Sequence, residues 1–306
     1  MPYPESLIRS IADRHGLVGS IELLPKGGMV NEAWAIGDAH ILRIVMEGRD
    51  AECDTEAARE GVVVPLLVEA GVTTPRLVAA DTEFAPRPYT IYERAPGELI
   101  GFSPHGYAHY EEAWRQLGRD YIALHGIQMT DAMKEHVTSA EAVDVEKWVG
   151  KALDKSAITR EEARDILLTA EKWASIGGTP PAPRLVHNDV HPWNLMGDPT
   201  TGRLTAILDW GDASLGDPAR DFAMMPLQCV PAMLEGYRER ELQSASRTQD
   251  FSLALAARAL VVGLSVALFE VRTPEMSEFE RKWWRMPPGG WSEMKSLVAA
   301  LWPEIA

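Results

Sequence analysis

The chain has 306 residues, of which 46% are hydrophobic, and it carries a formal net charge of −15 at pH 7. This length can bury a sizeable core and is long enough for two lobes, while the acidic charge argues against a nucleic-acid partner, because binding to a phosphate backbone needs a basic face. The two cysteines, Cys53 and Cys229, lie far apart without a C-x-x-C pair, so neither a disulfide framework nor a zinc site is indicated.

The beginning of the chain predicts a short helix. Apolar residues recur at helical spacing between Leu7 and Ala12, and the pair His15-Gly16 ends the pattern. The first residues contain no basic region followed by an apolar core, so no secretory signal is visible and the expected location is the cytoplasm.

Short extended runs separated by turns then predict an antiparallel sheet with one internal helix. The helix is expected over residues 54–70, where the pattern becomes helical and ends at Gly71. Strands are expected over residues 21–24, 32–36, 40–45, 76–80 and 89–93. The first hundred residues should therefore hold about five strands and one internal helix.

After the punctuated stretch 94–97, helical patterns follow over residues 107–125, 145–153 and 159–176. We expect the lobe boundary there, with an N-terminal lobe of residues 1–96 and a C-terminal lobe of residues 97–306. The longest apolar stretch, 253–269, is interrupted by Arg258 and is too short and amphipathic for a membrane span, so a buried helix is predicted. The fold class is α+β, with a small sheet-containing lobe followed by a larger, mostly helical lobe.

The most informative motif follows the apolar run 184–186. His187, Asp189 and Asn194 have the spacing H-x-D-x-x-x-x-N of a kinase catalytic loop, in which the Asp positions the attacking hydroxyl and the Asn reaches a magnesium ion. A hairpin turn over 197–202 leads to Asp209, which is expected to be a second magnesium ligand. Each residue alone would more often cap a turn or a helix, but the joint pattern indicates phosphoryl transfer.

The residues after this Asp carry a family signature. Asp209-Trp210, followed by the run from Gly216 to Asp221, resembles the D-[WF] … G-D-P-x-x-D pattern of the aminoglycoside phosphotransferase family, which phosphorylates hydroxyls of small molecules. The resemblance covers nearly the whole chain. It implies a bilobal protein-kinase-like fold, Mg²⁺ as cofactor and ATP or GTP as co-substrate, with a small-molecule hydroxyl as acceptor. Asp217 is expected at a helix N-cap, followed by Pro218 in the first turn, and Asp221 is expected to brace the catalytic loop.

In the small lobe the resemblance implies a nucleotide site. Gly27 and Gly28 lie where the family has its nucleotide loop, although most Gly-Gly steps are simply turns. Arg43 matches the phosphate-binding cation, where kinases generally have Lys, and a guanidinium can hold phosphate with two donors. Its ion-pair partner would be Glu60, or Glu56 one turn earlier, although exposed helical Glu residues are often only solvated.

The resemblance also implies a hinge after the last predicted strand of the sheet. The backbone of Glu93, Arg94 and Ala95 would form hydrogen bonds with the purine of the nucleotide. Asn188 stands where the family usually has Gly. A similar H-N-D occurs in the branch that acts on the 2″-hydroxyl of aminoglycosides, whose D-F-G-D resembles residues 209–212, and that branch can use GTP.

The expected function is therefore a Mg²⁺-dependent transfer of the γ-phosphoryl group to a small molecule, most plausibly an aminoglycoside. A macrolide or a metabolic alcohol would use the same catalytic groups, and a catalytically silent nucleotide-binding pseudokinase is the alternative from another class. Acidic groups such as Asp212 and Glu270 would favour a polyamine if they line the cleft. Trp283, Trp284 and Trp291 would favour a macrolide if they line a pocket, or they are core residues.

Overall fold

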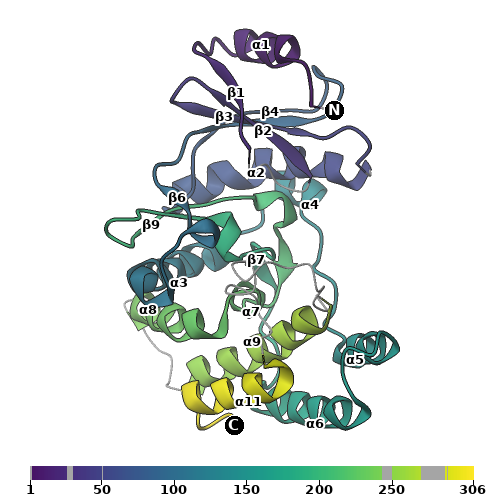
Figure 1. The fold of residues 1–306 in the computed structure, drawn as a ribbon. Coiled ribbons are helices and arrows are strands. Elements are labelled where there is room, and N and C mark those ends of the chain that lie inside the picture. Colours follow the sequence, from purple (N-terminus) through teal and green to yellow (C-terminus); the bar gives the residue numbers. More distant parts are fainter. Residues whose placement is uncertain (1, 26–29, 50, 243–249, 270–286, 288) are drawn as a thin grey trace.

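The computed structural model describes residues 2–25, 30–49, 51–242, 250–269, 287 and 289–306. It has a small sheet-containing lobe, at the top of Figure 1, and a larger, mostly helical lobe below it. The predicted α+β bilobal architecture is confirmed. The boundary at residues 96–97 remains our proposal, and it is consistent with the pairing of the next short strand, β6 (Glu98–Leu99), with a strand of the large lobe.

The small lobe is built on the predicted antiparallel sheet. Its strands lie in the order β1-β2-β3-β5-β4. Their bounds are β1 (Ile21–Leu23), β2 (Asn31–Ile36), β3 (His40–Val45), β4 (Leu77–Asp81) and β5 (Tyr89–Glu93). Helix α1 (Glu5–Arg14) covers one face of the sheet and α2 (Thr55–Glu69) the other (Figure 1).

The alternation of side chains along β3 determines which residues lie on each face of this sheet. Leu42 and Ile44 are fully buried in the cluster that includes the apolar residues of α1. Because successive strand residues point to opposite faces, Arg43 between them points toward α2. The sheet therefore has one apolar face under α1 and presents a single cation on the face that looks toward the large lobe.

The large lobe combines helices with short strands. Its helices are α3 (Glu111–Gly126), α4 (Asp131–His136), α5 (Val145–Asp154), α6 (Arg160–Gly177), α7 (Arg220–Ala223), α8 (Val230–Leu242), α9 (Asp250–Phe269) and α11 (Gly290–Leu301). Its strands are β6, already described, and β7 (Arg184–Val186), β8 (Leu195–Gly197), β9 (Leu204–Ile207) and β10 (Ser214–Gly216). These form two small antiparallel sheets, β6-β8-β9 and β10-β7.

The predicted helices of this lobe are present, and local sequence explains two of their ends. The stretch 107–110 is a 3₁₀ turn, so the α-helix predicted from 107 begins at Glu111. Helix α6 begins after a capping box, in which the Thr159 hydroxyl and the Glu162 carboxylate satisfy each other's backbone N–H groups. Within the described residues, no helix is both long and apolar enough to cross a membrane.

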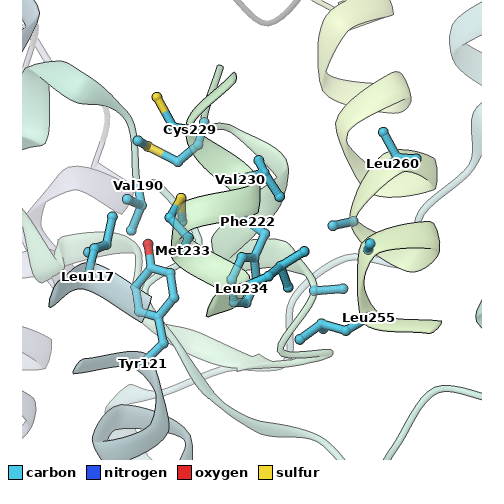
Figure 2. Close-up of a cluster of buried hydrophobic side chains, with 14 of the residues drawn as sticks. Leu117, Tyr121, Val190, Phe222, Cys229, Val230, Met233, Leu234, Leu255 and Leu260 are labelled. Atoms are coloured by element: carbon cyan, nitrogen blue, oxygen red, sulfur yellow. The ribbon is translucent and has the colours of Figure 1, made fainter. Parts of the chain in front are cut away.

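The main core of the large lobe also anchors the loop that carries the kinase-like motif. Figure 2 shows apolar side chains from α3, α7, α8 and α9 converging on one cluster, with Val190 of the loop after β7 among them. Val190 is 1% exposed, so its burial fixes the backbone next to Asp189. The neighbouring carboxylate is thereby directed away from this core.

Close backbone contact between α3 and α8 gives the first testable prediction. A side chain at Gly118 would collide with the carbonyl oxygen of Met233, whereas one at Gly150 in α5 would meet nothing within 4 Å. Gly118→Ala should therefore lower the free energy of unfolding by about 3 kcal/mol through overpacking. Gly150→Ala should raise it by about 0.5–1 kcal/mol, since Ala is the better helix former. Urea unfolding of both variants measures the difference, and equal midpoints would contradict the packing argument.

Candidate active site

The loop after β7 is held in a defined conformation by His187 and Asn188. The His187 ring is fully buried, with Nε2 2.8 Å from the carbonyl oxygen of Leu208 and Nδ1 3.3 Å from the backbone nitrogen of Asp189. Since a carbonyl can only accept, Nε2 carries the proton and Nδ1 accepts from the Asp189 N–H. His187 therefore supports the loop, with partners for both of its ring nitrogens.

The backbone at Asn188 explains the departure from the usual glycine. Its φ angle is 69°, in the left-handed region that Gly adopts freely and Asn tolerates better than most residues. The Asn188 side-chain oxygen accepts a hydrogen bond from Arg220 Nε at 2.7 Å. Asn can thus replace Gly here because its side chain has a partner in α7.

Asp189 and Asn194 meet at the start of the β8–β9 hairpin. Asn194 Nδ2 donates to the backbone oxygen of Asp189 at 2.9 Å and to its Oδ2 at 3.1 Å. The hairpin then returns the chain, because the Leu208 N–H donates to the Asn194 carbonyl at 2.8 Å. Asp209, the next residue, therefore lies beside Asn194, so the structure brings together all three residues of the predicted motif.

Arg43 connects this group to the small lobe. Its Nη1 lies 2.8 Å from Glu60 Oε1 and its Nη2 lies 2.5 Å from Asp209 Oδ1. Burial alone would lower the pKa of Arg43, but Asp209 and Glu60 outweigh it and hold the pKa well above its ordinary value. Burial likewise acts to raise the pKa of Asp209, but Arg43 outweighs it and keeps that pKa below its usual range. The predicted pairing of Arg43 with Glu60 is present.

Two further carboxylates lie near Asp209. Burial, followed by the charge of Asp209, raises the pKa of Glu56 to about 7, and Asn31 Nδ2 donates to Glu56 Oε2 at 3.4 Å. Burial and then the charges of Asp189 and Asp209 also raise the pKa of Asp212, although part of this residue remains exposed to solvent. The hydrogen-bond partner of Glu56 is therefore Asn31 and not Arg43. Asp212 adds negative charge at the open side of the site.

Two backbone N–H groups of the predicted hinge already form hydrogen bonds with neighbouring backbone carbonyls. The Glu93 N–H donates to the carbonyl oxygen of Arg76 at 2.9 Å, and the Arg94 N–H donates to the carbonyl oxygen of Ala39 at 2.7 Å. This leaves the Ala95 N–H as a backbone donor that could face a purine. Gly27 and Gly28, predicted in the nucleotide loop, lie outside the described residues.

The two aspartates of the G-D-P-x-x-D run have different contacts. Asp221 is fully buried, accepts from the Asn188 N–H at 3.0 Å and lies 2.9 Å from His125 Nε2, as expected for a residue that braces the loop. Asp217 Oδ1 accepts from the Ala219 N–H at 3.0 Å, but α7 begins only at Arg220 with Ala219 at its N-cap. The helix thus starts two residues later than predicted, because the intervening residues form a turn.

Sequence reasoning missed His191. Its Nε2 lies 3.6 Å from Asp189 Oδ2 and 3.3 Å from Asn194 Nδ2, so the ring lies against both motif residues. The spacing H-x-D-x-H could have revealed it.

The tryptophans predicted near the carboxyl end are only partly described. Trp291 is 4% exposed, packs 6.1 Å from the Trp173 ring, and donates from Nε1 to Asp165. It is a core residue that also borders a hollow lined by residues of α6 and α11, away from the site. Trp283, Trp284 and Glu270 lie outside the described residues.

The predicted metal ligands suit magnesium by their chemistry. Asp209 offers a carboxylate, and Asn194 offers its side-chain oxygen, since its Nδ2 is used on Asp189. Mg²⁺ prefers such hard oxygens and is commonly held by one or two protein ligands together with substrate phosphates. Among the described residues no group of three or more His, Cys, Asp or Glu side chains could hold a metal by itself.

Solved structures with the same overall arrangement cover almost the whole chain. The GDP complex of an aminoglycoside 2'-phosphotransferase-IIIa is 17% identical, with a TM-score of 0.64 over 97% of this chain and 96% of that one. The macrolide 2'-phosphotransferase MphH from Brachybacterium faecium is 20% identical, with a TM-score of 0.58 over 97% and 98%. A choline/ethanolamine kinase family protein from Mesorhizobium loti is 16% identical, with a TM-score of 0.60 over 95% of each chain. These similarities show the fold.

Sequence comparison shows the family. A curated relative, the uncharacterized protein YcbJ of Bacillus subtilis (strain 168), is 45% identical over 40 residues, which is only 13% of each chain. The family model described as "Phosphotransferase enzyme family" matches residues 22–257, well over half of the chain and all of the motif described above. This chain therefore belongs to the phosphotransferase enzyme family.

Proposed function

We propose that this enzyme transfers the γ-phosphoryl group of ATP or GTP to a hydroxyl of a cationic small molecule, with an aminoglycoside as the first candidate. The observation that carries the proposal is the convergence of Asp189, Asn194 and Asp209, with Arg43 joining Asp209 to Glu60. Catalysis of phosphoryl transfer needs in-line positioning and neutralisation of charge, and these groups can provide both.

Each residue has a role that follows from its contacts. The Asp189 carboxylate accepts a hydrogen bond from the acceptor hydroxyl and takes its proton late, while the Asn194 amide fixes the orientation of that carboxylate. Asn194 and Asp209 would hold Mg²⁺, which neutralises phosphate charge when bound. Arg43 would donate to phosphate oxygens, with Glu60 retaining one side of its guanidinium.

The nucleotide that donates the phosphoryl group is expected to lie between the sheet and the catalytic loop, with its purine at the hinge. The Ala95 N–H is the backbone donor that the described sheet leaves for the purine. The similar structures include complexes with GDP, ADP and ATP, so both purines remain candidates.

Charge at the open side of the site supports a cationic acceptor. Burial, followed by the charges of Asp189 and Asp209, raises the pKa of Asp212, so these three carboxylates lie near one another and repel. An acceptor with ammonium groups would relieve this repulsion, whereas a neutral alcohol would not. Similar structures hold kanamycin, gentamicin and streptomycin, and the choline/ethanolamine kinase family protein suggests a cationic metabolic alcohol as the second candidate.

The experiment that tests the proposal is a coupled assay of donor consumption, with ATP and GTP separately, against aminoglycosides, choline-like alcohols and macrolides. We expect turnover that needs both Mg²⁺ and a cationic acceptor. Turnover with macrolides alone would exclude an aminoglycoside or choline-like acceptor. Mg²⁺-dependent nucleotide binding without turnover on any acceptor would favour the pseudokinase alternative.

Asp212→Asn gives a direct test of the charge argument. One exposed ion pair contributes about 1 kcal/mol, so KM for a cationic acceptor should rise about fivefold. The KM of a neutral acceptor should not rise. The matched control is Asp13→Asn, which removes one exposed charge from α1 on the far face of the sheet and should change neither constant.

A further inference from the structure

Arg59 of α2 joins the small lobe to two separate segments of the large lobe. Its Nε donates to the carbonyl oxygen of His136 at 2.9 Å, and its Nη1 donates to the carbonyl oxygen of Gly211. His136 is the last residue of α4, and Gly211 lies two residues after Asp209. One side chain therefore spans the lobe interface beside a predicted metal ligand.

These contacts close a ring of interactions around the site. Glu60, the next residue of α2, binds Arg43, and Arg43 binds Asp209. The chain from Asp209 to Gly211 then returns to α2 through Arg59. A rotation of α2 would therefore break the contact of Arg59 and that of Glu60 together.

The ring leaves little space between α2 and the segment after Asp209. A Cβ atom on Gly211 would lie 2.9 Å from Cγ of Glu56, one turn before Glu60. Asp209 itself has a φ angle of 65°, in the left-handed region that an Asp rarely adopts without support. A backbone in this conformation needs neighbouring contacts to hold it, and Arg59 supplies one of them.

The second contact of Arg59 leads toward the catalytic loop. After His136, the chain pairs with β10, since the Ala140 N–H donates to Leu215 at 2.8 Å. The next carbonyl, that of Glu141, accepts from Arg220 Nη1 at 3.0 Å, and Arg220 holds Asn188 beside Asp189. Both halves of the site are thus connected to the same guanidinium.

We propose that Arg59 is a positioning residue that holds α2, and with it the Glu60–Arg43 pair, in register with Asp209 and the catalytic loop. It acts through the carbonyls of Gly211 and His136 and is placed to touch no substrate. The planar guanidinium donates to two carbonyls in different directions, which a lysine ammonium on a flexible stem does not reproduce. This proposal rests on the proposed phosphotransfer.

The test compares Arg59→Lys with Arg87→Lys in the full-length chain. Arg87 also binds the beginning of α2, through Nε to Asp54 Oδ1 at 2.8 Å, and it reaches the carbonyl of Met46, but these contacts stay within the small lobe. Calorimetry with Mg²⁺ and ATP or GTP, without acceptor, gives the nucleotide Kd. The coupled assay then gives kcat and both KM values.

For Arg59→Lys we expect a nucleotide Kd about tenfold higher and a kcat about tenfold lower, as is typical when a residue that orients a metal ligand is lost. The acceptor KM should change less than twofold, and Arg87→Lys should match the wild type in every constant. A wild-type Kd and a wild-type kcat in Arg59→Lys would overturn the positioning role. A variant that is less stable in urea but has an unchanged kcat per folded molecule would overturn it as well.

The calorimetric part does not need an acceptor, which separates the two proposals. If the wild-type chain binds no nucleotide, the proposed function fails and the role of Arg59 fails with it. If the wild-type chain binds nucleotide and Arg59→Lys binds it equally well, only the role of Arg59 is overturned.

Discussion

Asp189→Ala is expected to lower kcat by about 10³-fold, the typical contribution of a positioned general base. The affinity for Mg²⁺-nucleotide should remain nearly unchanged, because the Asp189 carboxylate contacts Asn194 and lies near His191 but has no contact with Arg43. Single-turnover kinetics and calorimetry measure the two effects separately.

The matched control for this variant is Asp198→Ala in the β8–β9 turn. Asp198 is half-buried, and its carboxylate accepts from the N–H groups of Thr200 and Thr201, so its loss should reduce stability slightly and leave kcat unchanged. Full turnover in Asp189→Ala would show that another group receives the proton, and the assignment of Asp189 would then be wrong.

Asp209→Ala should impair both nucleotide binding and turnover. Its carboxylate is the one predicted metal ligand that carries a charge, and it also neutralises Arg43 at 2.5 Å. We expect the Kd for nucleotide in the presence of Mg²⁺ to rise at least about 100-fold, since even residues that only orient metal ligands contribute up to this much. The affinity measured in EDTA should change far less, because no metal then joins the protein to the phosphates.

The contrast between the two variants is the decisive result. Loss of turnover alone in Asp189→Ala, with loss of turnover and metal-dependent binding in Asp209→Ala, would assign the two carboxylates to different steps. Wild-type turnover in both variants would remove the assignment of the site. An equal Mg²⁺ dependence of binding in Asp209→Ala and the wild type would exclude Asp209 as a ligand.

Local sequence patterns were sufficient for most secondary structure. The strands around Arg43 follow from alternation with period two between Gly-containing turns, and the Thr159 capping box marks the beginning of α6. The sequence predicts the start of α7 two residues early, because Asp217-Pro218 resembles an N-cap, whereas the Asp217 carboxylate accepts from Ala219 in a turn that precedes the helix. Asp217 also forms an ion pair with Arg258, 2.9 Å away in α9. That ion pair depends on packing and leaves no local trace.

By itself, the sequence determined which residues can perform the chemistry within one continuous segment. Asp189 and Asn194 are five residues apart, and the short hairpin that brings Asp209 back to them is a local structure, so spacing alone predicts the group. Only the tertiary structure decided how this segment meets the small lobe. Arg43 is 166 residues from Asp209 and Arg59 is 152 from Gly211, and such pairs form only when sheet, α2 and hairpin have packed, because no periodicity in the chain records their approach.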